Sequence, residues 1–232
     1  MLTWENTWKD IEDSAASVAV VPVGSTEQHG TNLPLASDSL STARLAEALA
    51  EQLDAYLVPL IPIGTSHEHL SFRGTVTLEH DTLKAVIRDI VDSLVRTGFQ
   101  TIIVTTMHGG NLVLRPESDF IPELDEEYPG ARILVAYLQH AFEEAWMAAG
   151  FATFGTHADE CEASMVASLQ PELVGSNPTD FPVDSTDFPS DVRQLSPGGS
   201  LGEPSRGSGE KGDVFWRVLL EVAVADAKRR LA

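Results

Sequence analysis

The chain has very little cysteine and no long hydrophobic run. Its one cysteine, Cys161, cannot form an intrachain disulfide, which fits a protein kept in a reducing cytosol. No apolar stretch approaches the ~20 residues that a membrane-spanning helix needs, and the opening residues MLTWENTWKD lack the apolar core of a signal peptide. We therefore expect a cytoplasmic protein that makes no membrane contact.

Basic residues are scarce as well. The 232 residues include 15 Lys and Arg, only four of them lysine, against 35 Asp and Glu, so the formal net charge is −20. Such a surface repels nucleic-acid phosphates and anionic lipids, which excludes both as expected partners. An acidic excess with little lysine is typical of proteins that work in multimolar salt, where charge repulsion is screened. A halophilic source is the preferred explanation, and an ordinary acidic cytosolic enzyme is the alternative.

Strand and helix patterns alternate over the first 170 residues. Apolar runs predict strands at 18–23, 57–63, 101–106 and 132–137. Helical spacing predicts helices at 4–16, 39–53, 81–96, 112–127 with a break at Pro116, 138–149, 158–169 and 214–231. This order indicates an α/β fold with a mainly parallel sheet and helices on both faces. We predict one domain over 1–232, with a long Gly/Pro/Ser-rich loop at 175–212 that is either an ordered lid or flexible.

The first candidate site residues follow the strand at 18–23. Glu27 and His29 stand in the loop after it, and Asp38 lies nine positions beyond His29. Mixed carboxylate and imidazole donors suit zinc, manganese or ferrous iron better than calcium or magnesium. The alternatives are that Asp38 only caps the next helix and that Glu27 and His29 are solvated loop residues.

A second candidate follows the strand at 101–106, where His108 begins the sequence HGGN. The two glycines let the backbone approach a ligand closely and can form an anion-binding nest, although His108 could also be a satisfied core histidine. Ligands of parallel sheets bind beyond the carboxyl ends of the strands. We therefore expect the loops 24–38, 64–75 and 107–111 to meet at one rim.

The segment THADECEAS, at 156–164, supplies the last candidates. On a helix His157 and Glu160 share a face at i and i+3, whereas Glu162 points elsewhere; a solvated acidic helix face is the alternative. Carboxylates on both sides of Cys161 raise the pKa of its thiol, so it is expected to be a packed residue and not a nucleophile.

Together these residues are enough for two divalent metal ions (Zn, Fe or Mn). The ligand candidates are Glu27, His29, Asp38, His108 and Glu160, and His157 is a further histidine that is not needed as a ligand. Two adjacent ions lower the pKa of a bridging water and polarise a carbonyl, which is the apparatus of amide hydrolysis. A histidine that is not a ligand can carry the proton to the leaving nitrogen.

Five segments give the chain a resemblance to the creatininase (creatinine amidohydrolase) family. They are PVGSTEQHGTNLPLASD, GTSHEHLSFRGTVTLE, MHGGN, HADECEAS and GSLGEPSRGSGEKG, in family order across nearly the whole chain. The resemblance implies a three-layer αβα sandwich, a dinuclear metal centre and a homo-oligomer, often a hexamer. It also implies that Glu27 and His108 bind one ion, His29 binds the other, Asp38 bridges them and His157 is the catalytic histidine.

Two departures concern the ligands and the substrate. The creatinine-opening branch has His-Tyr-Glu-Asn at 108–111, and its glutamate is a ligand, whereas Gly110 here cannot ligate. We expect Glu160 to supply that carboxylate, with Glu162 as the alternative. The tryptophans that enclose creatinine in that branch are replaced here by Leu138 and Thr153. Substrate contacts are expected from His69, Thr75, Gly109, Gly110 and Asn111.

The predicted function is hydrolysis of a non-peptide C–N amide bond in a small molecule, by a hydroxide held between the ions. The HGGN and HAxExE patterns resemble other branches of the family. The first choice is deformylation of a formylamino-pyrimidine ribonucleotide on the way to riboflavin and the deazaflavin coenzyme, where Arg73 would either meet the substrate phosphate or form a surface ion pair. The alternatives are creatinine ring-opening, trimming of a mycofactocin precursor peptide, and a non-catalytic metal-binding oligomer.

Overall fold

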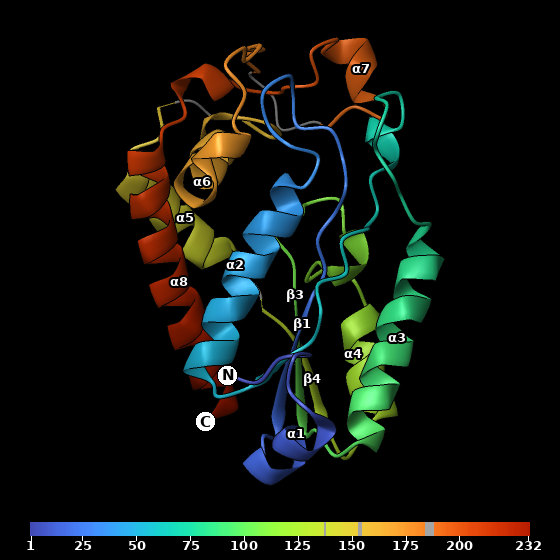
Figure 1. Ribbon diagram of the computed structural model, residues 1–232. Coiled ribbons are helices and arrows are strands. Elements are labelled where there is room, and N and C mark those ends of the chain that lie inside the picture. Colours follow the sequence, from blue (N-terminus) through green and yellow to red (C-terminus); the bar gives the residue numbers. More distant parts are fainter. Residues whose placement is uncertain (137, 153–154, 184–187) are drawn as a thin grey trace.

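Four parallel strands form one sheet between two layers of helices in the computed structural model, which describes residues 1–136, 138–152, 155–183 and 188–232 (Figure 1). The strands are β1 (Val18–Pro22), β2 (Tyr56–Leu57), β3 (Thr101–Thr105) and β4 (Arg132–Val135). Their spatial order is β2-β1-β3-β4, with Val18 opposite Thr101 in the central pair. Because β1 and β3 are the inner strands, their carboxyl ends lie side by side at the middle of the sheet.

The helices cover both faces of the sheet, which confirms the α/β sandwich predicted from the sequence. On one side lie α3 (His80–Arg96) and α4 (Phe120–Glu127), and on the other lie α2 (Ser37–Gln52), α5 (Gln139–Ala149), α6 (Glu160–Leu169) and α8 (Gly209–Leu231) (Figure 1). The short helices are α1 (Trp8–Ser14) and α7 (Val192–Leu195). Among the described residues, no helix combines the length and the apolar character needed to cross a membrane.

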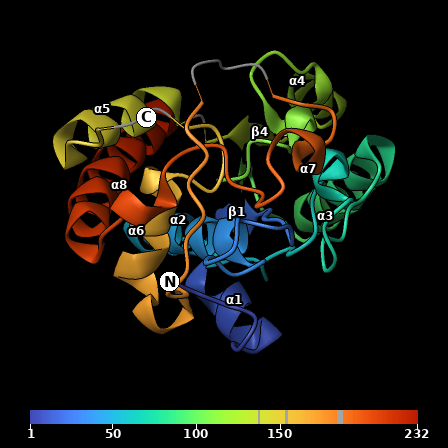
Figure 2. The same ribbon diagram turned by 90° about the horizontal axis from the view of Figure 1, so that it is seen from above.

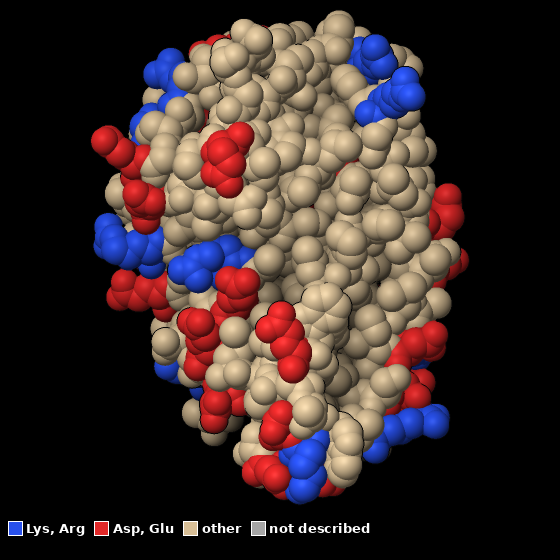
Figure 3. Space-filling view, viewed as in Figure 1, with Lys and Arg blue, Asp and Glu red and all other residues tan. Residues whose placement is uncertain are grey.

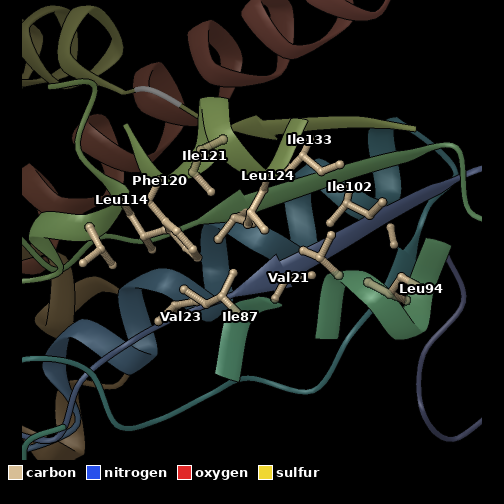
Figure 4. Close-up of a cluster of buried hydrophobic side chains, with 14 of the residues drawn as sticks. Val21, Val23, Ile87, Leu94, Ile102, Leu114, Phe120, Ile121, Leu124 and Ile133 are labelled. Atoms are coloured by element: carbon tan, nitrogen blue, oxygen red, sulfur yellow. The ribbon is translucent and has the colours of Figure 1, made fainter. Parts of the chain in front are cut away.

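The apolar core is divided by the sheet into two clusters. On the α3 and α4 side, Val21 and Ile102 from the strands meet Ile87 of α3 and Leu124 of α4, and all four are completely buried (Figure 4). On the other side, Val20 packs among residues of α2, α5, α6 and α8. Successive residues of β1 therefore face opposite cores, as a strand covered on both faces requires.

Several element boundaries differ from the sequence prediction. The predicted strand at 57–63 is reduced to β2, because Pro59 and Pro62 have no backbone N–H to donate to a neighbouring strand. The predicted helix at 112–127 begins only at Phe120, after a 3₁₀ turn at Leu112–Leu114. The strand predicted to end at Tyr137 is described as far as Val135, and Tyr137 lies outside the described residues.

The loops beyond the carboxyl ends of the strands form the upper end of the molecule. Seen from above, the described parts of the segment between α6 and α8 cross over these loops (Figure 2). This segment includes residues 175–208 of the predicted long loop, where the structure contains α7 and the 3₁₀ turn Pro204–Arg206, whereas residues 209–212 already belong to α8. The loops that carry the candidate site residues are therefore at this end of the molecule.

Candidate metal centre

Asp38 lies at the centre of the predicted site. It is the second residue of α2, and Ala36 stands at the cap position, so Asp38 does not serve as the helix cap. Its Oδ2 accepts a hydrogen bond from Ser25 Oγ at 2.6 Å. The same oxygen is 3.0 Å from His108 Nδ1 and 3.6 Å from His29 Nε2. One carboxylate oxygen therefore lies between two imidazoles that come from different loops.

Glu27 completes this group from the loop after β1. Its Oε2 is 3.5 Å from His108 Nε2, and its Oε1 is 3.6 Å from His69 Nε2 and 3.7 Å from His157 Nδ1. The side chain is 2% exposed. Glu27 thus faces three histidines from three separate loops, so the rim predicted from the strand ends does bring these residues together.

Three overlapping groups of described residues have donor atoms within 4.8 Å of one another. They are Glu27–His69–His157, His29–His157–Glu162 and Glu27–His29–Asp38. Because they share members, they form one continuous patch of oxygen and nitrogen donors. Such a patch has enough donors for more than one cation.

Glu162, and not Glu160, reaches this patch. Glu162 Oε2 is 3.7 Å from His29 Nε2, whereas Glu160 is fully buried and paired with Lys211 of α8. The argument from a shared helix face fails because α6 starts only at Glu160, with Asp159 as its cap, so His157 precedes the helix. Of the two candidate carboxylates, the alternative Glu162 is therefore the one that lies beside His29, and Glu160 is engaged elsewhere.

Gln28 is a site residue that the sequence analysis missed. Its buried side-chain amide nitrogen is 2.8 Å from His69 Nδ1, 2.9 Å from His157 Nε2 and 3.1 Å from the Gly199 carbonyl oxygen. Its Oε1 accepts a hydrogen bond from the Gly30 amide. One weak signal for Gln28 was its position between Glu27 and His29.

The residues predicted to contact substrate fall into two groups. His69, Gly109 and Gly110 line a cavity of about 670 Å³ together with Glu27, Asp38, His108, His157 and Glu162. Thr75 and Asn111 do not line it. Thr75 Oγ1 accepts from the Gln28 amide, and Asn111 Oδ1 accepts from the Thr65 amide. Both side chains thus bind the backbone of neighbouring loops, and the expected substrate contact of these two residues stays a prediction.

Gly110 leaves no room for a side chain. A Cβ there would lie 2.4 Å from His108 Nε2 and 2.5 Å from the Thr65 carbonyl oxygen. A carboxylate cannot enter the site from this position. Of the positions predicted to replace the enclosing tryptophans, Leu138 packs in the cluster that contains α5 and α8, whereas Thr153 lies outside the described residues.

The acidic residues of this cluster favour protonation of two of its histidines. Burial alone would lower the pKa of His29 and His108, but the Asp38 carboxylate and its acidic neighbours raise both to about 10. Burial also opposes the charge of Asp38, yet the charged His108 and His29 hold its pKa well below the usual value. Burial raises the pKa of Glu162 to about 8. Protons here supply a positive charge that bound cations could supply instead.

Two orphaned atoms fit the same interpretation. Glu27 Oε2 and His29 Nε2 are buried and have no hydrogen-bond partner among the described residues. An unpaired buried polar atom costs about 1–3 kcal/mol, and coordination of a cation would remove that cost. The second ring nitrogen of His108 lies 2.9 Å from the Thr65 carbonyl, the outer contact that orients many metal-binding histidines. The donor set therefore fits divalent metal ions.

Comparison with known proteins agrees with this geometry. The sequence profile of the family described as creatininase, creatinine amidohydrolase, matches residues 4–226. The chain belongs to the creatininase family. Creatinine amidohydrolase from Pseudomonas putida is 26% identical, over 97% of this chain and 95% of that protein. The prediction of a creatininase-family chain is confirmed.

A second relative comes from another branch, and a solved structure shows the fold. The mycofactocin precursor peptide peptidase of Mycobacterium ulcerans (strain Agy99) is 29% identical over 73% of this chain, which spans 62% of that protein. A creatininase variant of the Zn–Zn type superposes with a TM-score of 0.79 at 23% identity, and the match covers 98% of this chain and 97% of that one. The creatininase-family member described here is therefore a divergent one with the family's fold.

Proposed function

We propose that this creatininase-family hydrolase holds two divalent ions (Zn, Fe or Mn) and cleaves a C–N amide bond of a small molecule. The observation that carries the proposal is that Glu27 Oε2 and His29 Nε2 are buried without a hydrogen-bond partner among the described residues, inside overlapping groups of metal-type donors. Structural polar residues normally pair with each other when buried. Two donors left open within 4.8 Å of Asp38 are better explained by cations.

The ligands divide between two ions. Glu27 and His108 would hold one, His29 and Glu162 would hold the other, and Asp38 lies between them. Asp38 Oδ2 suits the bridging position because it is within 3.6 Å of a nitrogen from His29 and one from His108. When bound, such a pair of ions polarises a carbonyl and lowers the pKa of a water between them.

His157 is proposed to move the proton. Its Nε2 lies 2.8 Å from the Gln28 carbonyl oxygen, an acceptor, so Nε2 carries the hydrogen and donates. The lone pair then stands on Nδ1, which faces Glu27. Burial and the charges of His29 and His69 hold the pKa of His157 well below its usual value. A neutral imidazole in this place can accept a proton and pass it to the departing amine.

The HGGN and HAxExE motifs are the basis for a more specific proposal of the substrate. Deformylation of a formylamino-pyrimidine ribonucleotide is the first candidate. Creatinine and a mycofactocin-type peptide are the comparison substrates, because relatives with those names match the chain. A homo-oligomer, as in many members of the family, is proposed as the working form, and light scattering measures it.

The test uses purified protein and the matched pair His157→Ala and His140→Ala. His140 is an exposed residue of α5 whose side chain is 76% exposed. We expect the wild-type protein to carry about two ions per chain and to hydrolyse one of the three candidate amides. His157→Ala should keep its ions and lose roughly 10²–10⁴-fold in kcat, whereas His140→Ala should match the wild type.

Two outcomes contradict parts of the proposal. Loss of an ion together with His157 would make that residue a ligand and refute its role in proton transfer. Stoichiometric metal with no turnover of any candidate amide would favour the competing function, a non-catalytic metal-binding oligomer.

A further inference from the structure

The cavity at the candidate metal centre is lined mainly by carboxylates, histidines and uncharged residues. Its acidic lining residues are Glu27, Asp38, Glu68 and Glu162. Among the described lining residues Arg115 is the only lysine or arginine. At about 670 Å³ the cavity is in the range that holds a small organic ligand.

Arg115 is fixed at the edge of this cavity. Its Nε and Nη2 both donate to the Gly109 carbonyl oxygen, at 3.1 and 2.6 Å. Gly109 directly follows His108, and the 3₁₀ turn Leu112–Leu114 brings the chain back so that the two residues meet. The guanidinium is therefore held one residue away from a proposed metal ligand, and the described residues give its Nη1 no partner.

This orientation leaves part of the guanidinium fork available to a ligand. Arginine presents planar, parallel N–H groups that match the oxygens of a carboxylate or a phosphate. Anchoring of Nε and Nη2 reduces the entropy that the side chain would lose on binding such a group.

The net charge of the protein bears on what the Arg115 guanidinium can bind. With a net charge of −20, the protein repels anions in general. In the view of Figure 3, acidic side chains gather mainly over the lower half and the flanks, whereas the upper end is mostly uncharged with basic side chains at its corners. That end is the one formed by the loops of the site (Figure 1). Arg115 thus offers an anionic ligand a positive charge at the cavity, in a protein whose net charge is strongly negative.

We propose that Arg115 binds an anionic oxygen group of the substrate, a carboxylate or a phosphate, so that the compound hydrolysed is an acid that carries the scissile amide. This inference rests on the proposed function, because it concerns the same cavity. A purely structural Arg115 would need only its contact with Gly109 and would not distinguish acidic from neutral ligands.

The experiment uses hydroxamates, which chelate paired metal ions without being turned over. Succinic monohydroxamate and glutaric monohydroxamate carry a carboxylate, 3-phosphonopropanohydroxamate carries a phosphonate, and butyrohydroxamate is the neutral match. Binding to the metal-loaded protein is measured by calorimetry at one salt concentration. The proteins are wild type, Arg115→Gln, Arg115→Lys and Arg96→Gln. Arg96 is the control because its side chain is 77% exposed on α3, where it pairs with Asp92.

We expect the wild-type protein to bind at least one acidic hydroxamate about tenfold more tightly than the neutral one. Arg115→Gln should remove this preference while leaving the neutral Kd unchanged, Arg115→Lys should keep part of it, and Arg96→Gln should keep all of it. The carboxylate and phosphonate arms identify which anion is preferred.

Failure of the Arg115 proposal and failure of the proposed function give different results in this experiment. If no hydroxamate binds, the metal centre and the proposed function fail together. If all bind equally, or if Arg115→Gln keeps the preference, the metal centre stands and the assignment of Arg115 is overturned.

Discussion

The contrast between Glu160 and Glu162 gives the sharpest test of the site. The two residues lie two positions apart on α6, and each can be replaced by glutamine, which keeps the shape and removes the charge. Glu162 lies 3.7 Å from His29, whereas Glu160 pairs with Lys211 and accepts from the Ala152 amide. We expect Glu162→Gln to lose metal and Glu160→Gln to lose stability.

The expected loss of stability in Glu160→Gln depends on how deeply the ion pair with Lys211 is buried. Removing one partner of a fully buried ion pair costs about 3–5 kcal/mol. The side chain of Lys211 is 32% exposed, so water compensates part of its charge and about 2 kcal/mol is the better expectation. For a chain of this size that lowers Tm by roughly 4–8 °C. Glu162→Gln should lower metal affinity by about 100-fold, since even outer partners of metal ligands are worth 10–100-fold.

Metal content after dialysis against a weak chelator and Tm of the metal-free proteins are the two measurements. The metal-free forms separate the stability effect from any effect of bound ions. The assignment is refuted if Glu160→Gln releases an ion while Glu162→Gln keeps both, and the stability estimate is refuted if Tm of metal-free Glu160→Gln equals that of the wild type.

Three further predictions concern the bridge, pH and salt. Asp38→Asn should release both ions, because one oxygen serves both sides of the centre, and a variant that keeps one ion tightly would count against a bridge. Without metal, His29 and His108 have a folded pKa of about 10 against an ordinary 6.5, so their protons stabilise the fold below pH 6.5 and this contribution disappears as the pH rises to 10. Tm of the metal-free protein, followed by circular dichroism, should fall over that window, and a rise would contradict the cluster. Raising salt from 0.1 to 1 M shortens the Debye length from ~10 to ~3 Å, so Tm should increase if the halophilic interpretation is right, and a constant Tm would oppose it.

The sequence predicted the parts of the fold that depend on local patterns. The apolar runs in β1 and β3 fall on buried strands, and helical spacing located α3 within one residue at its start. The rim of the site was predictable because Glu27 and His108 directly follow parallel strands, whose carboxyl ends meet at one edge.

The remaining details depend on contacts between distant residues. Gln28 and Gly199 are 171 positions apart, and no pattern around either residue indicates that they touch. To choose between Glu160 and Glu162 one has to know at which residue α6 begins, and sequence patterns locate the start of a helix only to within a few positions. Thr75 and Asn111 resembled substrate contacts because they stand in site loops, but their polar atoms hold the backbone of neighbouring loops.

The side-chain amide of Gln28 links the loop after β1 to the chain around Gly199. Gly199 has φ +90°, and a Cβ there would lie 2.0 Å from Gln28 Oε1, so this contact depends on the absence of a side chain. If the chain around Gly199 moved outward, the same amide would also lose its fixed position beside His69. The chain at Gly199 is therefore tied to the loop that carries Glu27 and His29, so a substitution at Gly199 would disturb the candidate metal centre from a distant part of the sequence.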